Sequence, residues 1–447
     1  MSDRVRIVMV VFDALRPDMA TPELMPNLDR FRPFGTTLAD ARAVFPTDTR
    51  ANVPSLMTGV RPGRHGVMGN AWFDPRLHPT DPFSTISAAE VERADRVLGG
   101  KLFEVPSLGD LLAEQGRSMA VISTASSGTT RLIHHTVRQH PTHLCLHCHE
   151  ANACSPPGLA EEAMRRFGPL PPADRPDLAA ITYAVDAFLG WIWPEHAPDV
   201  TVLWLNEPDT SYHWFGIGSD EARGAIRHCD EQFGRLLDWW LADGRAEGVQ
   251  LVALSDHGQI GVGGRVDLMG ALTGVGLSPA GTFSDGADLL VVPGYPIRLY
   301  ARDRGRGVVD RAAAALLAQP WCGDLFAREN IEGTLPLSAY GAAHARAPDL
   351  ILTMRSGPGL DPTGQPGVSP VDAASPFAGI HGGLSDQETT CLAILAGTRF
   401  RTGAVVATRT SAVDLLPTML EALGLQTPLR LDGTAIGEAY VQLGWAL

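Results

Sequence analysis

Five separated segments of this sequence carry carboxylates, imidazoles and hydroxyls, the side chains that bind divalent cations or attack electrophiles. The residues concerned are Asp13, Thr47, Thr49, Asp209, His213, Asp256, His257 and His381. Two neighbouring divalent cations need about six or seven such ligands, arriving from separate strand ends. A cation beside a threonine hydroxyl lowers the pKa of that hydroxyl, so that its oxygen can act as a nucleophile at neutral pH. The sequence therefore supplies the parts of a two-metal site, with either Thr47 or Thr49 as the nucleophile.

Short apolar or β-branched runs precede most of these segments and predict the strands that hold them. Strands are expected at residues 5–12, 118–122, 200–205, 250–254, 289–292 and 349–353, and helices at residues 179–191, 219–241, 308–318 and 411–423. This alternation is typical of an α/β fold with a mainly parallel central sheet sandwiched by helices. Ligands bind at the carboxyl ends of the strands in such sheets. We therefore expect Asp13, Asp209 and Asp256 to meet at one edge.

The chain, residues 1–447, is long enough for a single large catalytic domain with insertions. Two stretches, residues 72–198 and 261–347, contain many Pro and Gly residues and show little periodicity. Long stretches of this kind in a compact domain are usually functional. We expect both to be inserted segments that form a cap or lid over the site.

The formal net charge of −14 argues against a nucleic-acid polymer or an anionic membrane as the main partner, because both are polyanions. An acidic protein that binds anionic substrates must bring cations to its site. Lys101 is the single lysine, which disfavours lysine-based catalysis. The first apolar run, residues 7–12, is far shorter than the roughly 20 residues of a membrane span, and no small-residue cleavage site follows it. We expect a strand there and a cytoplasmic protein, and we leave assembly as a homodimer open.

Taken together and in this order, the five segments resemble those of the alkaline phosphatase superfamily, and most of all its type I phosphodiesterase/nucleotide pyrophosphatase branch. The resemblance covers most of the chain and includes the tail at residues 413–433. It favours Thr49 over Thr47, because the spacing from Thr49 to Thr58-Gly59 and to Asn70 matches the family. It implies two sets of ligands: Asp209, His213 and His381 for one cation, and Asp13, Asp256, His257 and the Thr49 oxygen for the other.

The resemblance also implies a reaction. The two cations would be zinc, with manganese or iron as alternatives, and Asn70 would donate to a non-bridging phosphoryl oxygen. Small phosphoric diesters or related phosphorus esters are the expected substrates, hydrolysed through a phosphothreonine at Thr49. A phosphate monoester or phosphonate (C–P bond) hydrolase is the alternative. A phosphomutase would need a large extra insertion, and a sulfatase a Cys or Ser nucleophile, so both are disfavoured.

Arg50 is the main departure from the nucleotide-hydrolysing relatives, which resemble one another in placing an aromatic residue after the nucleophile. An arginine there can pair with a second negative charge on the substrate, or can form a salt bridge with a nearby carboxylate. The stretch at residues 381–387 looks more like phosphonoacetate hydrolases of the same superfamily. Those relatives bind the substrate carboxylate with lysines, which this chain lacks apart from Lys101.

Simpler structural roles compete with several of these assignments. Asp13 could cap a helix, and Asp209 with His213 could form an ordinary ion pair one helical turn apart. The His-rich segment with Cys145, Cys148 and Cys154 has the ligand types of a structural zinc site, although such sites usually draw ligands from separated elements. We leave open whether this segment binds a further metal or contacts substrate.

Overall fold

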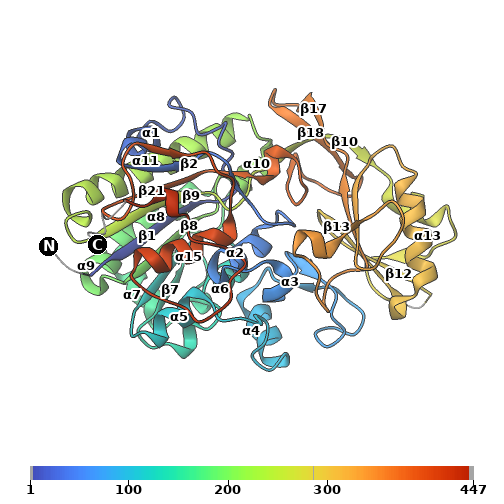
Figure 1. Ribbon diagram of the computed structural model, residues 1–447, viewed down its shortest axis with the longest axis horizontal. Helices are drawn as coiled ribbons and strands as arrows, with labels where there is room; N and C mark the ends of the chain where they lie inside the picture. Colours follow the sequence, from blue (N-terminus) through green and yellow to red (C-terminus); the bar gives the residue numbers. More distant parts are fainter. Residues whose placement is uncertain (1–3, 285, 442–447) are drawn as a thin grey trace, which may run out of the picture.

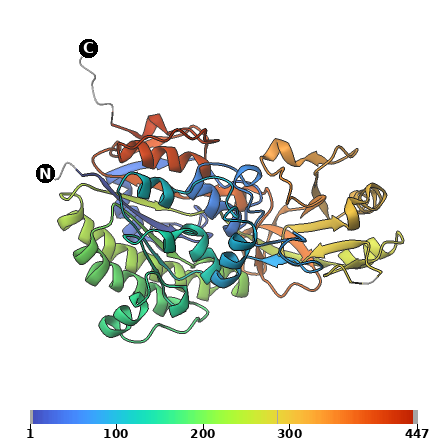
Figure 2. The same cartoon turned by 90° about the horizontal axis from the view of Figure 1, so that it is seen from below.

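The computed structural model describes residues 4–284 and 286–441, which form two lobes (Figures 1 and 2). The larger lobe contains an eight-stranded sheet in which only β21 runs antiparallel to its neighbours. This confirms the expected α/β class and the mainly parallel sheet. In spatial order its strands are β22 (Ala404–Val406), β2 (Gly35–Leu38), β21 (Ala393–Ala396), β9 (Val249–Leu254), β1 (Arg6–Phe12), β8 (Val200–Leu205), β6 (Met119–Ser123) and β7 (Leu144–His147).

Helices cover both faces of this sheet, as the alternation of side chains along β1 requires. Ile7, Met9 and Val11 pack into one core with α2 (Thr49–Thr58) and α15 (Ala412–Ala422). The residues between them, such as Val8 and Val10, pack into a second core with α8 (Leu178–Ala187) and α11 (Asp220–Trp239). Each fully buried aliphatic side chain contributes about 1.5–3 kcal/mol. The strand is therefore fixed from both sides, which holds its carboxyl end in place.

The smaller lobe, at the right of Figure 1, runs from β10 to β19 and contains two further sheets. One has four strands, β17 (Gly357–Leu360), β18 (Pro366–Asp372), β10 (Ile260–Val266) and β19 (Gly379–Ile380). The other has six, β11 (Pro279–Ala280), β12 (Leu289–Val292), β13 (Ile297–Ala301), β16 (Leu350–Met354), β14 (Cys322–Ala327) and β15 (Leu335–Pro336), covered by α13 (Arg306–Leu317). The strands expected at residues 289–292 and 349–353 thus exist, but they belong to this lobe.

The structure places the two stretches that were expected as insertions in different parts of the fold. Residues 261–347 lie within the smaller lobe, which continues to β19. Residues 72–198 were expected to form a cap, but they contain β6 and β7 and so belong in part to the central sheet. The four residues of β7 are all buried, although two of them are Cys145 and His147, which looked like ligands rather than core.

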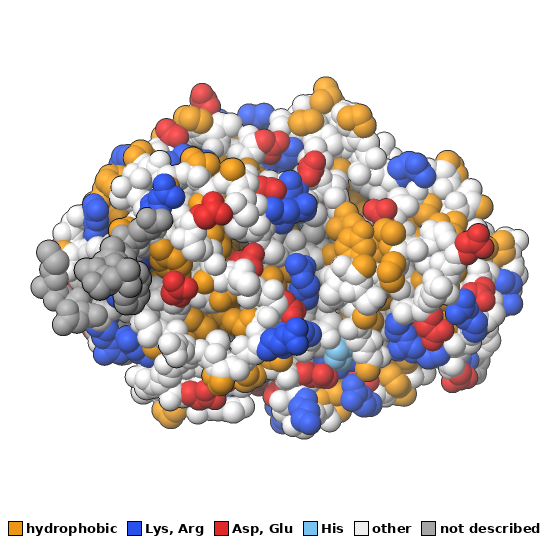
Figure 3. All heavy atoms as spheres, in the orientation of Figure 1, with side chains coloured by type: hydrophobic (Ala, Val, Ile, Leu, Met, Phe, Trp, Pro, Cys, Tyr) orange, Lys and Arg blue, Asp and Glu red, His pale blue; other side chains and the backbone are white. Residues whose placement is uncertain are grey.

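Buried arginines join the lobes. Arg346 of the smaller lobe donates to the carbonyl oxygens of Gly66 (2.8 Å) and Leu102 (2.9 Å) in the larger one. On the face shown in Figure 3, basic and acidic side chains intermingle along the junction of the lobes, so neither sign dominates there. Among the described residues, none of the helices combines the length and the apolar character needed to cross a bilayer.

Candidate active site and metal centre

Thr49 is the first residue of α2, and its hydroxyl faces the other candidate residues. Its Oγ1 lies 3.0 Å from Nε2 of His257. The competing residue, Thr47, donates its hydroxyl to the carbonyl oxygen of Gly383 at 2.9 Å. The structure therefore places the hydroxyl of Thr49, and not that of Thr47, among the candidate ligands.

One group of candidate ligands comes from the carboxyl ends of the neighbouring parallel strands β1 and β9. Nε2 of His257 lies 3.5 Å from Oδ1 of Asp13 and 3.3 Å from Oδ2 of Asp256, and all three residues are buried. No helix begins at Asp13; instead, its Oδ2 accepts from the indole N–H of Trp204 at 2.9 Å. The geometry therefore fits a ligand rather than a helix cap.

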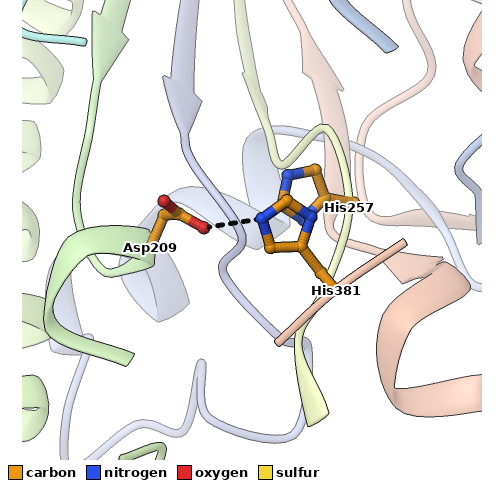
Figure 4. Close-up of side chains that lie close together, drawn as sticks. All are labelled: Asp209, His257 and His381. Atoms are coloured by element: carbon orange, nitrogen blue, oxygen red, sulfur yellow. Dashed lines mark ion pairs between the residues drawn. The ribbon is translucent and has the colours of Figure 1, made fainter. Parts of the chain in front are cut away.

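A second group adjoins the first. Asp209 begins α10 (Asp209–Phe215), His213 lies one turn further along it, and His381 directly follows β19. Oδ1 of Asp209 is 3.4 Å from Nε2 of both histidines. Figure 4 shows Asp209 facing His381, whose ring stacks on that of His257 at 4.0 Å. His257 of the first group also lies within 4.8 Å of ligand atoms of Asp209 and His381, so the two groups are neighbours.

The three histidines share one orientation. Nδ1 of each lies at hydrogen-bond distance from a backbone carbonyl oxygen: Gly379 for His213 (2.8 Å), Gly258 for His257 (2.9 Å) and Thr47 for His381 (2.8 Å). A carbonyl oxygen only accepts, so each Nδ1 carries the proton and each Nε2 presents its lone pair to the site. Backbone acceptors of this kind are the usual outer partners of metal-bound histidines.

This arrangement fits divalent cations on two counts. Nε2 atoms of His213 and His381 are 3.1 Å apart, and with both protons on Nδ1 neither Nε2 can donate to the other. In addition, three buried carboxylate oxygens have no hydrogen-bond partner among the described residues; they are Oδ1 of Asp13, Oδ1 of Asp209 and Oδ2 of Asp256. Unpaired buried acceptors are unfavourable, and cations would satisfy all of them.

The electrostatics agree with that conclusion. Burial, together with the nearby carboxylates of Asp256 and Asp209, raises the pKa of Asp13 well above its usual range. Burial and the neighbouring rings of His257 and His213 hold the pKa of His381 far below the ordinary value. Carboxylate oxygens crowded together beside neutral imidazoles are a donor set that suits zinc and similar ions.

Asn70 and Arg50 lie next to the nucleophile and line the same cavity. Oδ1 of Asn70 accepts from the backbone N–H of Arg50 at 3.4 Å, while its Nδ2 has no partner among the described residues. The Arg50 guanidinium donates through Nε to the hydroxyl of Thr129 at 3.0 Å. No carboxylate of the described residues forms an ion pair with Arg50, so the salt-bridge alternative is not observed. Burial lowers the pKa of Arg50, with Asp48 opposing the shift.

The cavity over the site has a volume of about 620 Å³. Its walls include several residues that the sequence did not single out as site residues: Asp177, Asn206, Tyr295 and Arg298. Asn206 stands three residues before Asp209 and could have been noticed from the same motif. Arg298 and Tyr295 come from the smaller lobe, and the sequence around them contains no motif that indicates a site residue.

The His-rich segment reaches this cavity through His147 and His149. Both nitrogens of His149 face acceptors, the carbonyl oxygen of Pro171 and a carboxylate oxygen of Asp177, each at 2.9 Å. Although burial opposes the charged ring, the hydrogen bond to Asp177 raises the pKa of His149. The ring of His149, at the wall of the cavity, is therefore protonated more readily than a free imidazole.

The cysteines of this segment are not arranged as a metal site. Cys145, Cys148 and Cys154 are buried free thiols, and burial raises the pKa of each. Among the described residues, groups able to hold a metal occur only at the two positions described above, and neither includes a cysteine. The other alternative, contact with substrate, stays a prediction; His147 and His149 are the residues of this segment that line the cavity.

The fold is that of the alkaline phosphatase superfamily. Residues 7–361 match the family model of type I phosphodiesterase/nucleotide pyrophosphatase, and the chain belongs to that family. Among solved structures, murine ectonucleotide pyrophosphatase/phosphodiesterase 5 has the same fold, with a TM-score of 0.67 at 18% identity over 96% of this chain and 97% of that chain. Its structure is that of an inactive threonine-to-alanine variant in complex with AMP.

Curated relatives match a shorter region. A venom phosphodiesterase of Naja atra is 25% identical over 235 residues, which is 53% of this chain but 24% of that protein. Human ectonucleotide pyrophosphatase/phosphodiesterase family member 1 is 24% identical over 238 residues, 21% of its length. The aligned part of the chain thus spans only about a quarter of the length of these relatives.

Proposed function

We propose that this protein hydrolyses small phosphoric diesters or related phosphorus esters, with Thr49 as the nucleophile and two divalent cations, zinc in the first place. The observation that carries the proposal is the pairing of Nε2 lone pairs of His213 and His381, 3.1 Å apart, beside three unpartnered carboxylate oxygens and the Thr49 hydroxyl. Together these groups suit bound cations next to a nucleophile better than a structural role.

Some of these residues would bind the cations, and others act on the substrate. Asp209, His213 and His381 would hold one cation, and Asp13, Asp256 and His257 the other. When bound, the two cations would lower the pKa of the threonine hydroxyl and offset charge on the leaving oxygen. Thr49 Oγ1 attacks phosphorus and expels the alcohol, which leaves a phosphothreonine that water then hydrolyses. Asn70 Nδ2 donates to a non-bridging phosphoryl oxygen as negative charge develops there.

Two findings on relatives support this assignment. The family that the chain belongs to is named for phosphodiesterase and nucleotide pyrophosphatase activity. The murine relative was made inactive by replacing a threonine with alanine, and it bound AMP in that form. A mononucleotide ester is therefore one substrate class to test.

A second candidate function, hydrolysis of a phosphate monoester or phosphonate on the same site, is favoured by Arg50. Its guanidinium lines the cavity and has no acidic partner among the described residues. A half-buried cation without a carboxylate partner suits a substrate that carries more than one negative charge.

A panel of substrates tests the proposal. The metal-restored protein is assayed with a bis-aryl phosphate, an aryl phosphate, an aryl phosphonate monoester, a nucleotide diester and phosphonoacetate. We expect Thr49→Ala to abolish most turnover while about two metal ions per chain are retained. Thr58→Ala is the matched control, because it removes a buried hydroxyl from the other end of the same helix, where Thr58 donates to the carbonyl oxygen of Pro54. Near-normal rates in the Thr49 variant would refute the assignment.

A further inference from the structure

A buried ion pair joins the smaller lobe to the residue before the nucleophile. Arg298 lies in β13 and is 1% exposed, and Asp48 directly precedes α2 and is fully buried. Nη2 of Arg298 pairs with Oδ2 of Asp48, and Nη1 donates to the carbonyl oxygen of Pro296 at 3.1 Å. The contact therefore connects two segments that are 250 residues apart in the chain.

Asp48 stands at the N-cap position of α2 but does not cap the helix. An aspartate there usually accepts from the first free backbone amides of the helix, worth about 1 kcal/mol. Here no such bond forms. The carboxylate instead faces Arg298, and the same Oδ2 accepts from the backbone N–H of Asn70 at 3.4 Å. One oxygen thus links the smaller lobe, the start of the nucleophile helix and the segment of the amide donor.

Gly69 makes this convergence possible. A Cβ at this position would collide with the guanidinium of Arg298 and with the carboxylate of Asp48, and the φ angle of Gly69 is +120°. Only glycine accepts both the close approach and this backbone conformation without strain. The side chain of the next residue, Asn70, is in turn oriented by the backbone N–H of Arg50.

We propose that Arg298 and Asp48 are positioning residues, which fix the Thr49 hydroxyl and the Asn70 amide relative to each other from the smaller lobe. The inference rests on the proposed function of Thr49 and Asn70. Arg298 lines the cavity, yet its charge is matched by Asp48, so it acts through these two residues rather than as a free cation for substrate. A displacement of a reacting group by about 1 Å can slow a reaction about 100-fold.

Kinetics of single and double variants test this role. We expect Arg298→Gln and Asp48→Asn each to lower kcat by about 10- to 100-fold, with KM and metal content nearly unchanged. The double variant should lose no more than the worse single variant, because both changes remove one shared contact. Arg298→Lys, which keeps the charge, should recover part of kcat. The matched control is Arg304→Gln, which breaks an ion pair with Asp349 inside the same lobe; it should alter thermal stability without altering kcat.

Several results would overturn the inference. If Thr49→Ala is inactive while Arg298→Gln and Asp48→Asn keep kcat within about twofold of the wild-type value, the pair is only structural. Losses that multiply in the double variant would show that the two residues act independently.

Hydrogen–deuterium exchange separates failure of the positioning role of Arg298 and Asp48 from failure of the proposed function. If no substrate of the panel is turned over, or Thr49→Ala stays active, the proposed function is wrong. The positional claim is then still decided by amide exchange in residues 48–52 and 66–72. Faster exchange in Arg298→Gln than in Arg304→Gln supports the positioning contact, and equal exchange refutes it.

Discussion

Replacement of Arg50 by Ala should separate substrates by their charge. In the structure the guanidinium donates to the hydroxyl of Thr129, and no carboxylate of the described residues forms an ion pair with it. It therefore remains available to an anionic oxygen of the substrate. A hydrogen bond that involves a charged group contributes about 1.5–3 kcal/mol, and each factor of ten corresponds to about 1.4 kcal/mol. We thus expect kcat/KM for a dianionic substrate to fall about 10- to 150-fold in the variant.

The assay compares two esters with the same leaving group, p-nitrophenyl phosphate and bis(p-nitrophenyl) phosphate. The diester carries one negative charge, so its kcat/KM should fall by less than about threefold. Arg175→Ala is the control for long-range charge, because Arg175 lines the same cavity and its guanidinium lies 3.9 Å from the centre of the Trp214 ring.

Two outcomes would contradict this reasoning. Equal losses on both esters in the Arg50 variant would make Arg50 a structural residue. A change of the ester ratio in Arg175→Ala as large as that in Arg50→Ala would show that the overall potential of the cavity, and not a contact of Arg50, discriminates between substrates.

Three further outcomes are expected. Asn70→Ala should lower kcat by about 10²- to 10³-fold without loss of metal, because it removes the donor to the phosphoryl oxygen on which negative charge develops. Steady-state kinetics and metal analysis of the variant check this. Chelation should lower the unfolding temperature, and added zinc should restore it. An ion that binds only the folded state and is present at a concentration of 100 times its Kd stabilises that state by about 2.7 kcal/mol. A thermal melt that the chelator leaves unchanged would argue against bound cations. His149→Gln should flatten the dependence of stability on pH. The folded-state pKa of His149 is raised, so its contribution is present below the ordinary value of about 6.5 and is lost as the pH rises through the folded-state pKa. Denaturant unfolding of both proteins between about pH 5.5 and 9 tests this, and parallel curves would contradict it.

The main strands of the central sheet were predictable because their apolar runs are buried on both faces. The expected strand at residues 200–205 coincides with β8, and those at residues 5–12 and 250–254 differ from β1 and β9 by one residue. Local sequence could not show which sheet a strand joins. For that reason β12 and β16 were expected in the central sheet, although pairing places them in the smaller lobe.

The sequence predicted the positions of those site residues that follow strands of the central sheet, but not of those that depend on how the two lobes pack. Asp13, Asp209 and Asp256 follow strands whose carboxyl ends meet at one edge, so their approach follows from the topology. The pairing of Arg298 with Asp48 depends on how two lobes dock, and neither residue stands in a pattern that indicates it. β7 was missed because a buried four-residue strand that contains Cys and His resembles a ligand-bearing loop.

The smaller lobe enters and leaves the larger one at the candidate ligands themselves. It begins with β10 three residues after His257 and ends with β19 at the residue before His381, and the rings of these two histidines are 4.0 Å apart. Cations bound there would hold the two ends of the smaller lobe together, as a crosslink does when it closes a long loop. A change in the length or content of the lobe would then leave the positions of the ligands at its two ends unchanged.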